Sequence, residues 1–134
     1  MTRPASLLRL LIGVHLVWTV LLTPAALESR PFSSISPIGW FSLVLIFTTV
    51  GLDLAAFLLA RRNPRTAGLL AAIGPFLFVG PFIGDQVGLF SSLKAPLQIT
   101  VVEVLALLTQ LAILYVALRL RREGAAAGKA ESMG

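Results

Sequence analysis

Four long apolar runs, almost free of charged residues, constrain this chain more than any other feature of its sequence. They cover residues 5–22, 38–60, 67–90 and 96–118 of the 134-residue chain. Since about 20 apolar residues cross a bilayer as a helix, each run can span a membrane, the first only just. Only 13% of the residues are charged, against about 25% in a soluble domain. The sequence therefore predicts an all-α fold, an integral membrane four-helix bundle.

The first run has two interpretations. Arg3 and Arg9 flank the start of its apolar stretch and small residues follow it, which is also the pattern of a secretory signal peptide. We expect a retained first span instead, because three further spans follow and because His15 and Trp18 interrupt the apolar stretch. Pro24 is expected to end this helix, since proline lacks a backbone N–H and clashes with the preceding turn.

The third run contains two Gly-Pro pairs, at Pro75 and Pro81. We expect a regular helix up to Gly80 and a kinked or partly unwound segment over residues 81–90. Three glycines four residues apart would let another helix approach closely, and they are Gly80, Gly84 and Gly88. Packing within the chain is the preferred interpretation of this row, and a homodimer surface is the alternative.

Basic residues lie at the ends of the apolar runs and indicate the orientation. If both termini share one side, that side carries nine Lys and Arg residues and the other side carries two. The nine are Arg3, Arg9, Arg61, Arg62, Arg65, Arg119, Arg121, Arg122 and Lys129, and the two are Arg30 and Lys94. Short cytoplasmic loops are enriched in basic residues, so we expect a multi-pass cell (inner) membrane protein with cytoplasmic termini.

The ends of the chain complete the predicted organisation. Residues 1–122 form the four-span domain, and residues 123–134, rich in Ala, Gly and Ser, are expected to form a disordered cytoplasmic tail. The formal charge of +5 is explained by topology, and no DNA-binding motif accompanies it. We therefore expect the lipid bilayer, and no nucleic acid, as a partner.

Three polar residues lie at similar depth in different spans. At 1.5 Å per residue, His15, Asp53 and Gln110 are about 12, 10 and 12 Å from the cytoplasmic ends of their spans. Intramembrane ionisable residues are functional candidates by default, and imidazole titrates near neutrality. One interpretation is a site for a proton or a polar ligand group. The other is a hydrogen-bonded lock between helices.

A second polar group lies toward the opposite surface. Glu103 is about 10 Å from the outer end of the last span, and it shares a helix face with Gln110, seven residues on. Asp85 and three uncharged polar residues lie near the same side, namely Gln86, Gln98 and Thr100. They form either the acidic floor of an outward-facing pocket or, for Glu103, a carboxyl that snorkels or bonds to a backbone carbonyl.

Other chemistry finds little support. The chain has no cysteine and one histidine, so thiolate metal sites and iron–sulfur clusters are excluded and no metal site is expected. No phosphate loop, His-Glu-x-x-His or Gly-x-Ser-x-Gly motif occurs, so catalytic residues are not assigned. No cofactor is evident. The phenylalanines around the third span are expected to pack in the core or against lipid, and a quinone or lipid bound against their rings is the alternative.

One hairpin resembles a known family. The stretch 53–60, a basic turn with Pro64, and the stretch 67–72 are similar to the central hairpin of DoxX-like small membrane proteins, and residues 9–13 are similar to their opening. The resemblance covers about a third of the chain and implies a four-helix bundle. In some members it implies a role beside quinone-linked oxidoreductases.

Three functions are therefore carried forward. The first is an accessory or assembly subunit of a larger membrane complex, non-enzymatic and linked to a quinone oxidoreductase. The second is a small proton-coupled transporter that uses His15, Asp53 and Glu103, with the interrupted third span as its support. The third is an enzyme that modifies a lipid or quinone, with acid–base work by Asp53 or Glu103.

Overall fold

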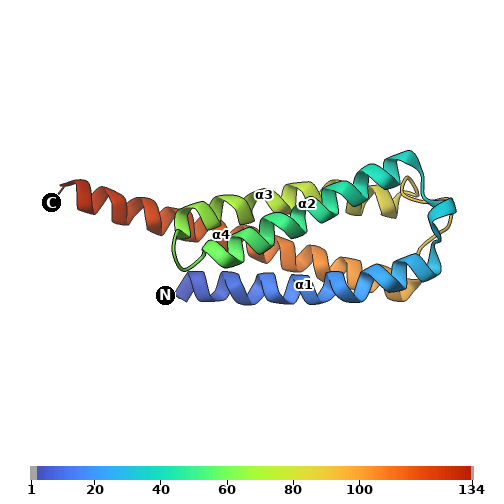
Figure 1. The fold of residues 1–134 in the computed structure, drawn as a ribbon, viewed down its shortest axis with the longest axis horizontal. Helices are drawn as coiled ribbons and strands as arrows, with labels where there is room; N and C mark the ends of the chain where they lie inside the picture. Colours follow the sequence, from blue (N-terminus) through green and yellow to red (C-terminus); the bar gives the residue numbers. More distant parts are fainter. Residues whose placement is uncertain (1–2, 134) are drawn as a thin grey trace.

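The chain forms four long helices joined by short connections in the computed structural model, which describes residues 3–133 (Figure 1). The elements are α1 (Arg3–Ser29), the short 3₁₀ helix η1 (Phe32–Ser34), α2 (Pro37–Leu59), α3 (Pro64–Gln86) and α4 (Leu97–Met133). All four α-helices are long and apolar enough to cross a membrane. The predicted class, an all-helical chain with four candidate membrane spans, is confirmed.

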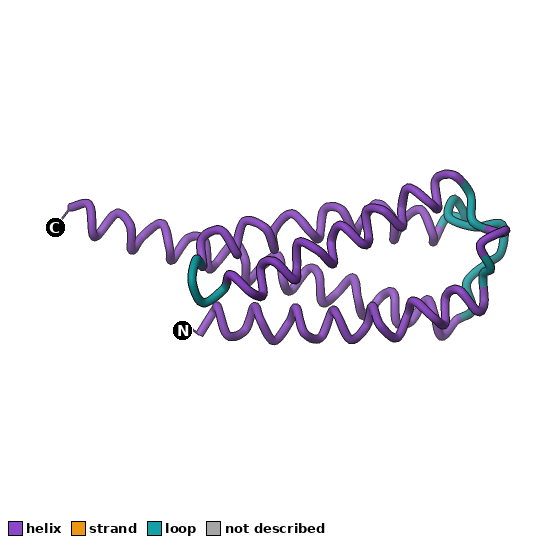
Figure 2. The backbone as a smooth tube through the Cα atoms, in the orientation of Figure 1, coloured by secondary structure: helices purple, strands orange, loops and turns teal. Residues whose placement is uncertain are grey.

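The helices run antiparallel, so the connections gather at the two ends of the bundle (Figure 2). The α2–α3 turn lies at the same end as the N-terminus, and we call this the turn end (Figure 1). Helix η1 and the connection 87–96 lie at the opposite end, which we call the loop end. Both helices of the central hairpin begin with a proline, and the residue before each proline is an N-cap. Ser36 Oγ accepts from Gly39 N at 2.9 Å before Pro37, and Asn63 Oδ1 accepts from Thr66 N at 3.2 Å before Pro64.

Helix α1 continues through Pro24 to Ser29, so the expectation that this proline ends the helix is wrong. Hydroxyls on the preceding turns bond back to the helix: Thr23 Oγ1 donates to the Thr19 carbonyl at 2.8 Å, and Thr19 Oγ1 donates to the His15 carbonyl at 3.0 Å. These hydroxyls do not bond to the Val20 carbonyl, which is the one that Pro24 leaves without its helical donor. Membrane helices tolerate an internal proline where the surroundings satisfy such a group.

Helix α3 is likewise continuous through Pro75 and Pro81 and ends at Gln86. The partly unwound segment expected from Pro81 onward is therefore helical for most of its length. The helix stops where Gly88 takes a φ of +81°, a left-handed conformation that glycine adopts without strain.

Helix α4 extends beyond the bundle to Met133 and projects from the turn end (Figure 1). Residues 123–133, expected as a disordered tail, are helical in the structure, and residues 125–133 are exposed. Alanine, glutamate and lysine in this segment favour helix in the absence of tertiary contacts. The last residue of the predicted tail, Gly134, lies outside the described residues.

The packed core lies toward the turn end and is built largely from alanine. Its buried members come from all four helices and are Ala5, Leu8, Ile12, Ala56, Ala60, Ala67, Ala71, Ala72, Ile113, Val116, Ala117 and Leu120. Small side chains let helix backbones approach closely, which is the usual basis of packing in membranes. Helix α2 packs mainly on α3, and α1 packs mainly on α4, while α1 and α2 make few contacts with each other.

The glycine row on α3 does not pack within the chain. A Cβ added at Gly80 or Gly84 would meet nothing within 4 Å. The preferred interpretation of that row as an intramolecular packing surface is therefore wrong. Close approach occurs at Gly68 and Gly74 instead, where an added Cβ would lie 2.9 Å from the Ala117 carbonyl oxygen and 3.2 Å from Thr49 Cγ2, respectively.

Candidate functional site

Three of the predicted site residues meet in the interior of the bundle. His15 from α1, Asp53 from α2 and Gln110 from α4 are each 0% exposed, and we call them the buried triad. Gln110 Nε2 donates a hydrogen bond to Asp53 Oδ2 at 2.8 Å. His15 Nδ1 lies 3.2 Å from the same oxygen. The structure thus brings together the residues that the depth estimate places in one layer.

Helix α3 completes the surroundings of the triad with a glycine. A Cβ at Gly74 would lie 3.3 Å from Asp53 Oδ1 and 3.5 Å from Gln110 Oε1. The Thr49 hydroxyl, one turn before Asp53, donates to the Leu45 carbonyl at 3.0 Å and lies 3.3 Å from the Gly74 carbonyl. A methyl group at position 74 would be in tight contact with Asp53 and in ordinary contact with Gln110, so little space remains there for a larger side chain. Sequence reasoning read Gly74 only as part of a Gly-Pro pair.

Several polar atoms of the triad have no hydrogen-bond partner. Asp53 Oδ1, Gln110 Oε1 and both ring nitrogens of His15 are buried and unsatisfied. The imidazole packs edge-to-face with Phe78 of α3, with ring centroids 5.6 Å apart and an interplanar angle of 84°. Buried polar atoms are usually satisfied, so each of these requires an explanation.

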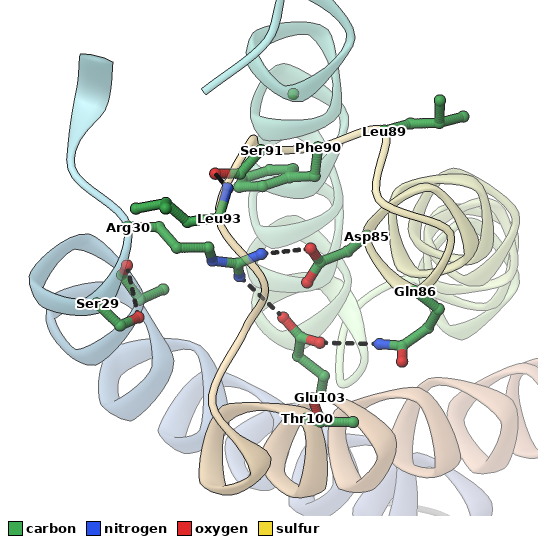
Figure 3. Close-up of polar contacts among 12 residues, drawn as sticks. Ser29, Arg30, Asp85, Gln86, Leu89, Phe90, Ser91, Leu93, Thr100 and Glu103 are labelled. Carbon is green, nitrogen blue, oxygen red and sulfur yellow. Dashed lines mark hydrogen bonds and ion pairs between the residues drawn. The ribbon is translucent and has the colours of Figure 1, made fainter. Parts of the chain in front are cut away.

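A second cluster lies at the loop end and is charged (Figure 3). The guanidinium of Arg30 donates from Nη1 to Asp85 Oδ1, and its Nη2 lies 3.5 Å from Glu103 Oε1. Gln86 Nε2 donates to Glu103 Oε2 at 3.1 Å. Only 3% of Arg30 is exposed, and its guanidinium carbon lies 4.9 Å from the ring centroid of Phe90. We call Arg30, Asp85, Gln86 and Glu103 the loop-end cluster.

Arg30 is the member that sequence reasoning missed. The sequence analysis used Arg30 only as a loop charge that indicates topology. Two carboxylates, Asp85 and Glu103, lie in neighbouring apolar runs that contain no basic residue near them. A buried carboxylate requires a countercharge, and this requirement is the signal that could have identified Arg30. The structure pairs Glu103 with Arg30 and Gln86, not with a backbone carbonyl.

The other polar residues near the loop end do not join this cluster. Gln98 lines a separate small pocket together with Glu28 and Ser29. The hydroxyl of Thr100 is turned to its own helix and donates to the Pro96 carbonyl at 3.4 Å. Within residues 3–133, no group of three or more His, Cys, Asp or Glu side chains is arranged to hold a metal ion.

A cavity of about 760 Å³ lies on the loop-end side of the triad, between α1 and α2. Its walls are almost wholly apolar. The helices α1 and α2 contribute Leu22, Ala26, Leu27, Leu43, Val44 and Phe47, among others, and α3 and α4 contribute Phe78, Pro81, Phe82 and Ala106. Arg30, Asp85 and Glu103 also line it, so one part of the cavity is charged.

The cavity and the buried triad are separated by about one helical turn and by the ring of Phe78. Thr19, which lines the cavity, is one helical turn after His15, and Ala106, which also lines it, is one turn before Gln110. Phe78 lines the cavity and contacts the His15 ring. The aromatic ring of Phe78 therefore separates an apolar binding space from a closed polar site.

This arrangement favours binding over covalent chemistry. The hydroxyls along the cavity do not pair with a base: those of Thr19, Thr23 and Thr48 donate to carbonyls of their own helices. An apolar chain would fit the cavity walls, and a polar group would fit against the loop-end cluster. No protein-family model, curated protein or solved structure matches the chain.

Proposed function

We propose that this protein is a multi-pass membrane protein that holds one amphiphilic molecule of the bilayer between α1 and α2. The observation that carries the proposal is a cavity with apolar walls, at one part of which the buried Arg30 is paired with the partly buried Asp85 and Glu103. The chemistry it fits is a long apolar tail joined to a small polar head, as in a lipid or an isoprenoid quinone.

The size and place of the cavity support this class of ligand. Its 760 Å³ falls within the range of about 300–1,000 Å³ that is typical of small-molecule sites. The space lies between two helices that make few contacts with each other, so a molecule can reach it from the hydrocarbon region without crossing the packed core. A water-soluble ligand would gain little from such walls.

The loop-end cluster supports recognition of a head group. Arg30 Nε is buried and has no hydrogen-bond partner, so a donor remains after Asp85 and Glu103 are paired. The carboxylates supply acceptors beside it. A head group that both donates and accepts hydrogen bonds, such as a hydroxyl or a phosphate ester with an amine, would satisfy these groups better than a hydrocarbon would.

The orientation is part of the same proposal. Nine basic residues belong to the turn end or to the segments that adjoin it, and two belong to the loop end. This bias supports cytoplasmic termini in a cell membrane, and in that orientation the loop-end cluster faces the outer side of the bilayer. Reporter fusions at the C-terminus and in the connection 87–96 test it, because the two positions must report opposite sides.

An accessory role remains the proposed context for this binding. The unpacked row at Gly80 and Gly84 and the exposed rings of Phe47 and Phe76, 54% and 73% accessible, offer a surface to a second copy or another subunit. The resemblance to DoxX-like proteins points to quinone-linked oxidoreductases as the complex to test. A proton-coupled carrier has less support, since all three members of the triad are 0% exposed.

Native mass spectrometry of protein extracted in mild detergent tests the proposal. Thr19→Phe puts a ring into the cavity, while Val20→Phe puts the same ring on the adjacent position, which is 71% exposed to the surroundings of the bundle. We expect a single bound amphiphile on the wild type and on Val20→Phe, and none on Thr19→Phe. Its mass, and its absorbance if it is a quinone, identifies the ligand. A wild type with no bound molecule contradicts the proposal.

A further inference from the structure

The unsatisfied atoms of the buried triad point to a bound proton. We propose that Asp53 carries a proton on Oδ1, which it donates to Gln110 Oε1. The two side chains then form a doubly hydrogen-bonded pair of a carboxylic acid and an amide in the interior of the bundle. This inference does not depend on the proposed function, because it stands whether the cavity is filled or empty.

The geometry of the pair supports this assignment. Gln110 Nε2 donates to Asp53 Oδ2 at 2.8 Å, which fixes one side of the pair. The other oxygen of each group, Asp53 Oδ1 and Gln110 Oε1, is buried without a partner. Both oxygens flank one point, the position of a Cβ on Gly74, at 3.3 and 3.5 Å. A single proton between them would satisfy both atoms.

An ionised Asp53 fits its surroundings less well. The carboxyl faces His15 from α1, Gln110 from α4, and Gly74 from α3, with Thr49 on its own helix. Among residues 3–133, His15 is the one basic side chain within ion-pair distance of Asp53. If Asp53 were ionised, its Oδ1 and the Oε1 of Gln110 would both remain acceptors without a donor. Burying polar atoms without hydrogen bonds is costly.

The proton belongs on Asp53 and not on His15. A charged imidazolium would bury an Nε2–H that has no acceptor, because Nε2 is buried and without a partner. A neutral imidazole carries one buried N–H instead of two, and its Nδ1 lies 3.2 Å from Asp53 Oδ2 without forming a hydrogen bond to it. The triad as a whole is then neutral, which suits a site without a countercharge.

The consequence is a proton site in the membrane interior, next to the cavity but closed from it. Phe78 contacts the His15 ring on one side and lines the cavity on the other. A proton held on Asp53 thus remains isolated from water and from a cavity ligand while Phe78 keeps its position.

Infrared spectroscopy of the purified full-length protein at neutral pH tests the inference. A protonated carboxyl has a C=O stretch above the amide I band, and a carboxylate does not. We expect this band in the difference spectrum between wild type and Asp53→Asn. Asparagine keeps both hydrogen bonds to Gln110, so the variant should fold, and its helical circular dichroism verifies this. Glu103→Gln is the control, because its difference spectrum reports a different carboxyl.

A second variant tests the partner of the proton. Gln110→Leu removes the amide, so the Asp53 carboxyl band should remain and shift to higher frequency because the acid loses its hydrogen bond. Loss of the acid band in this variant, or an acid band at the wild-type frequency, would contradict the shared proton. A carboxylate band in place of the acid band in the wild-type minus Asp53→Asn spectrum would overturn the inference.

Discussion

The two polar clusters of this bundle differ in closure and in charge. The buried triad consists of one carboxyl, one imidazole and one amide, enclosed on all four sides by helices. The loop-end cluster pairs an arginine with two carboxylates and lines a cavity of 760 Å³. Both contain intramembrane carboxyl groups of the kind that indicates function. The comparison shows that the role of an intramembrane carboxyl group depends on whether the neighbouring side chains close the site or leave it open.

Side-chain size explains why one cluster is closed and the other open. Alanines dominate the core at the turn end, and Gly74 admits α3 to within van der Waals distance of the triad. Larger side chains, such as Phe47, Phe82 and Trp40, line the loop-end half, where α1 and α2 separate. The small residues thus let the helices pack closely around the buried triad, whereas the larger residues of the loop-end half leave space for a ligand.

The largest expected effect is at the charged cluster. Arg30→Ala leaves the partly buried Asp85 and Glu103 without their buried cation, which should lower the free energy of unfolding toward the lower end of about 3–5 kcal/mol. Arg62→Ala removes an exposed arginine at the turn end and should change little. Detergent-unfolding titrations of both variants measure the difference.

A combined variant distinguishes charge from packing at this cluster. Neutralising both acids as Asp85→Asn and Glu103→Gln alongside Arg30→Met should recover much of the stability that Arg30→Ala loses. If Arg30→Ala is as stable as Arg62→Ala, the cluster does not contribute in the way described.

The next effect is at the close approach of α3 to the triad. Gly74→Val places side-chain atoms at 3.2–3.5 Å or less from Thr49, Asp53 and Gln110, and overpacking of this kind costs about 1–3 kcal/mol. Gly80→Val is the matched control, since nothing lies within 4 Å of its added Cβ. Equal thermal stability of the two variants would show that the triad region is loosely packed.

The smallest effect is expected from Asp53→Asn. The amide can donate to Gln110 Oε1 and accept from Gln110 Nε2, so the stability should stay close to that of the wild type. Asp53→Ala removes both bonds and leaves buried polar groups unpaired, at a cost of about 1–3 kcal/mol. Thermal unfolding of the pair measures this contrast. An Asp53→Asn variant as unstable as Asp53→Ala would indicate an ion pair with His15.

Sequence reasoning reached the helical class, the four spans and the residues of the triad, because apolar run length and depth along a helix are both set by local chemistry. It did not reach Arg30, whose role depends on carboxylates 55 and 73 residues away. It also misjudged Pro24 and the glycine row. Neighbouring groups decide whether a proline breaks a membrane helix and which glycine face is covered, and a single helix pattern does not contain them.

Photolabelling tests most directly the central claim that the loop-end half binds a bilayer amphiphile. The protein is reconstituted with a diazirine-bearing lipid, illuminated, and mapped by peptide mass spectrometry. Phe78 is only 7% exposed and lines the cavity, so a label there reports a molecule inside it. We expect labelling of Phe78 in the wild type and in Val20→Phe, and its loss in Thr19→Phe. An unlabelled Phe78 in the wild type, or equal labelling in Thr19→Phe, would contradict the account.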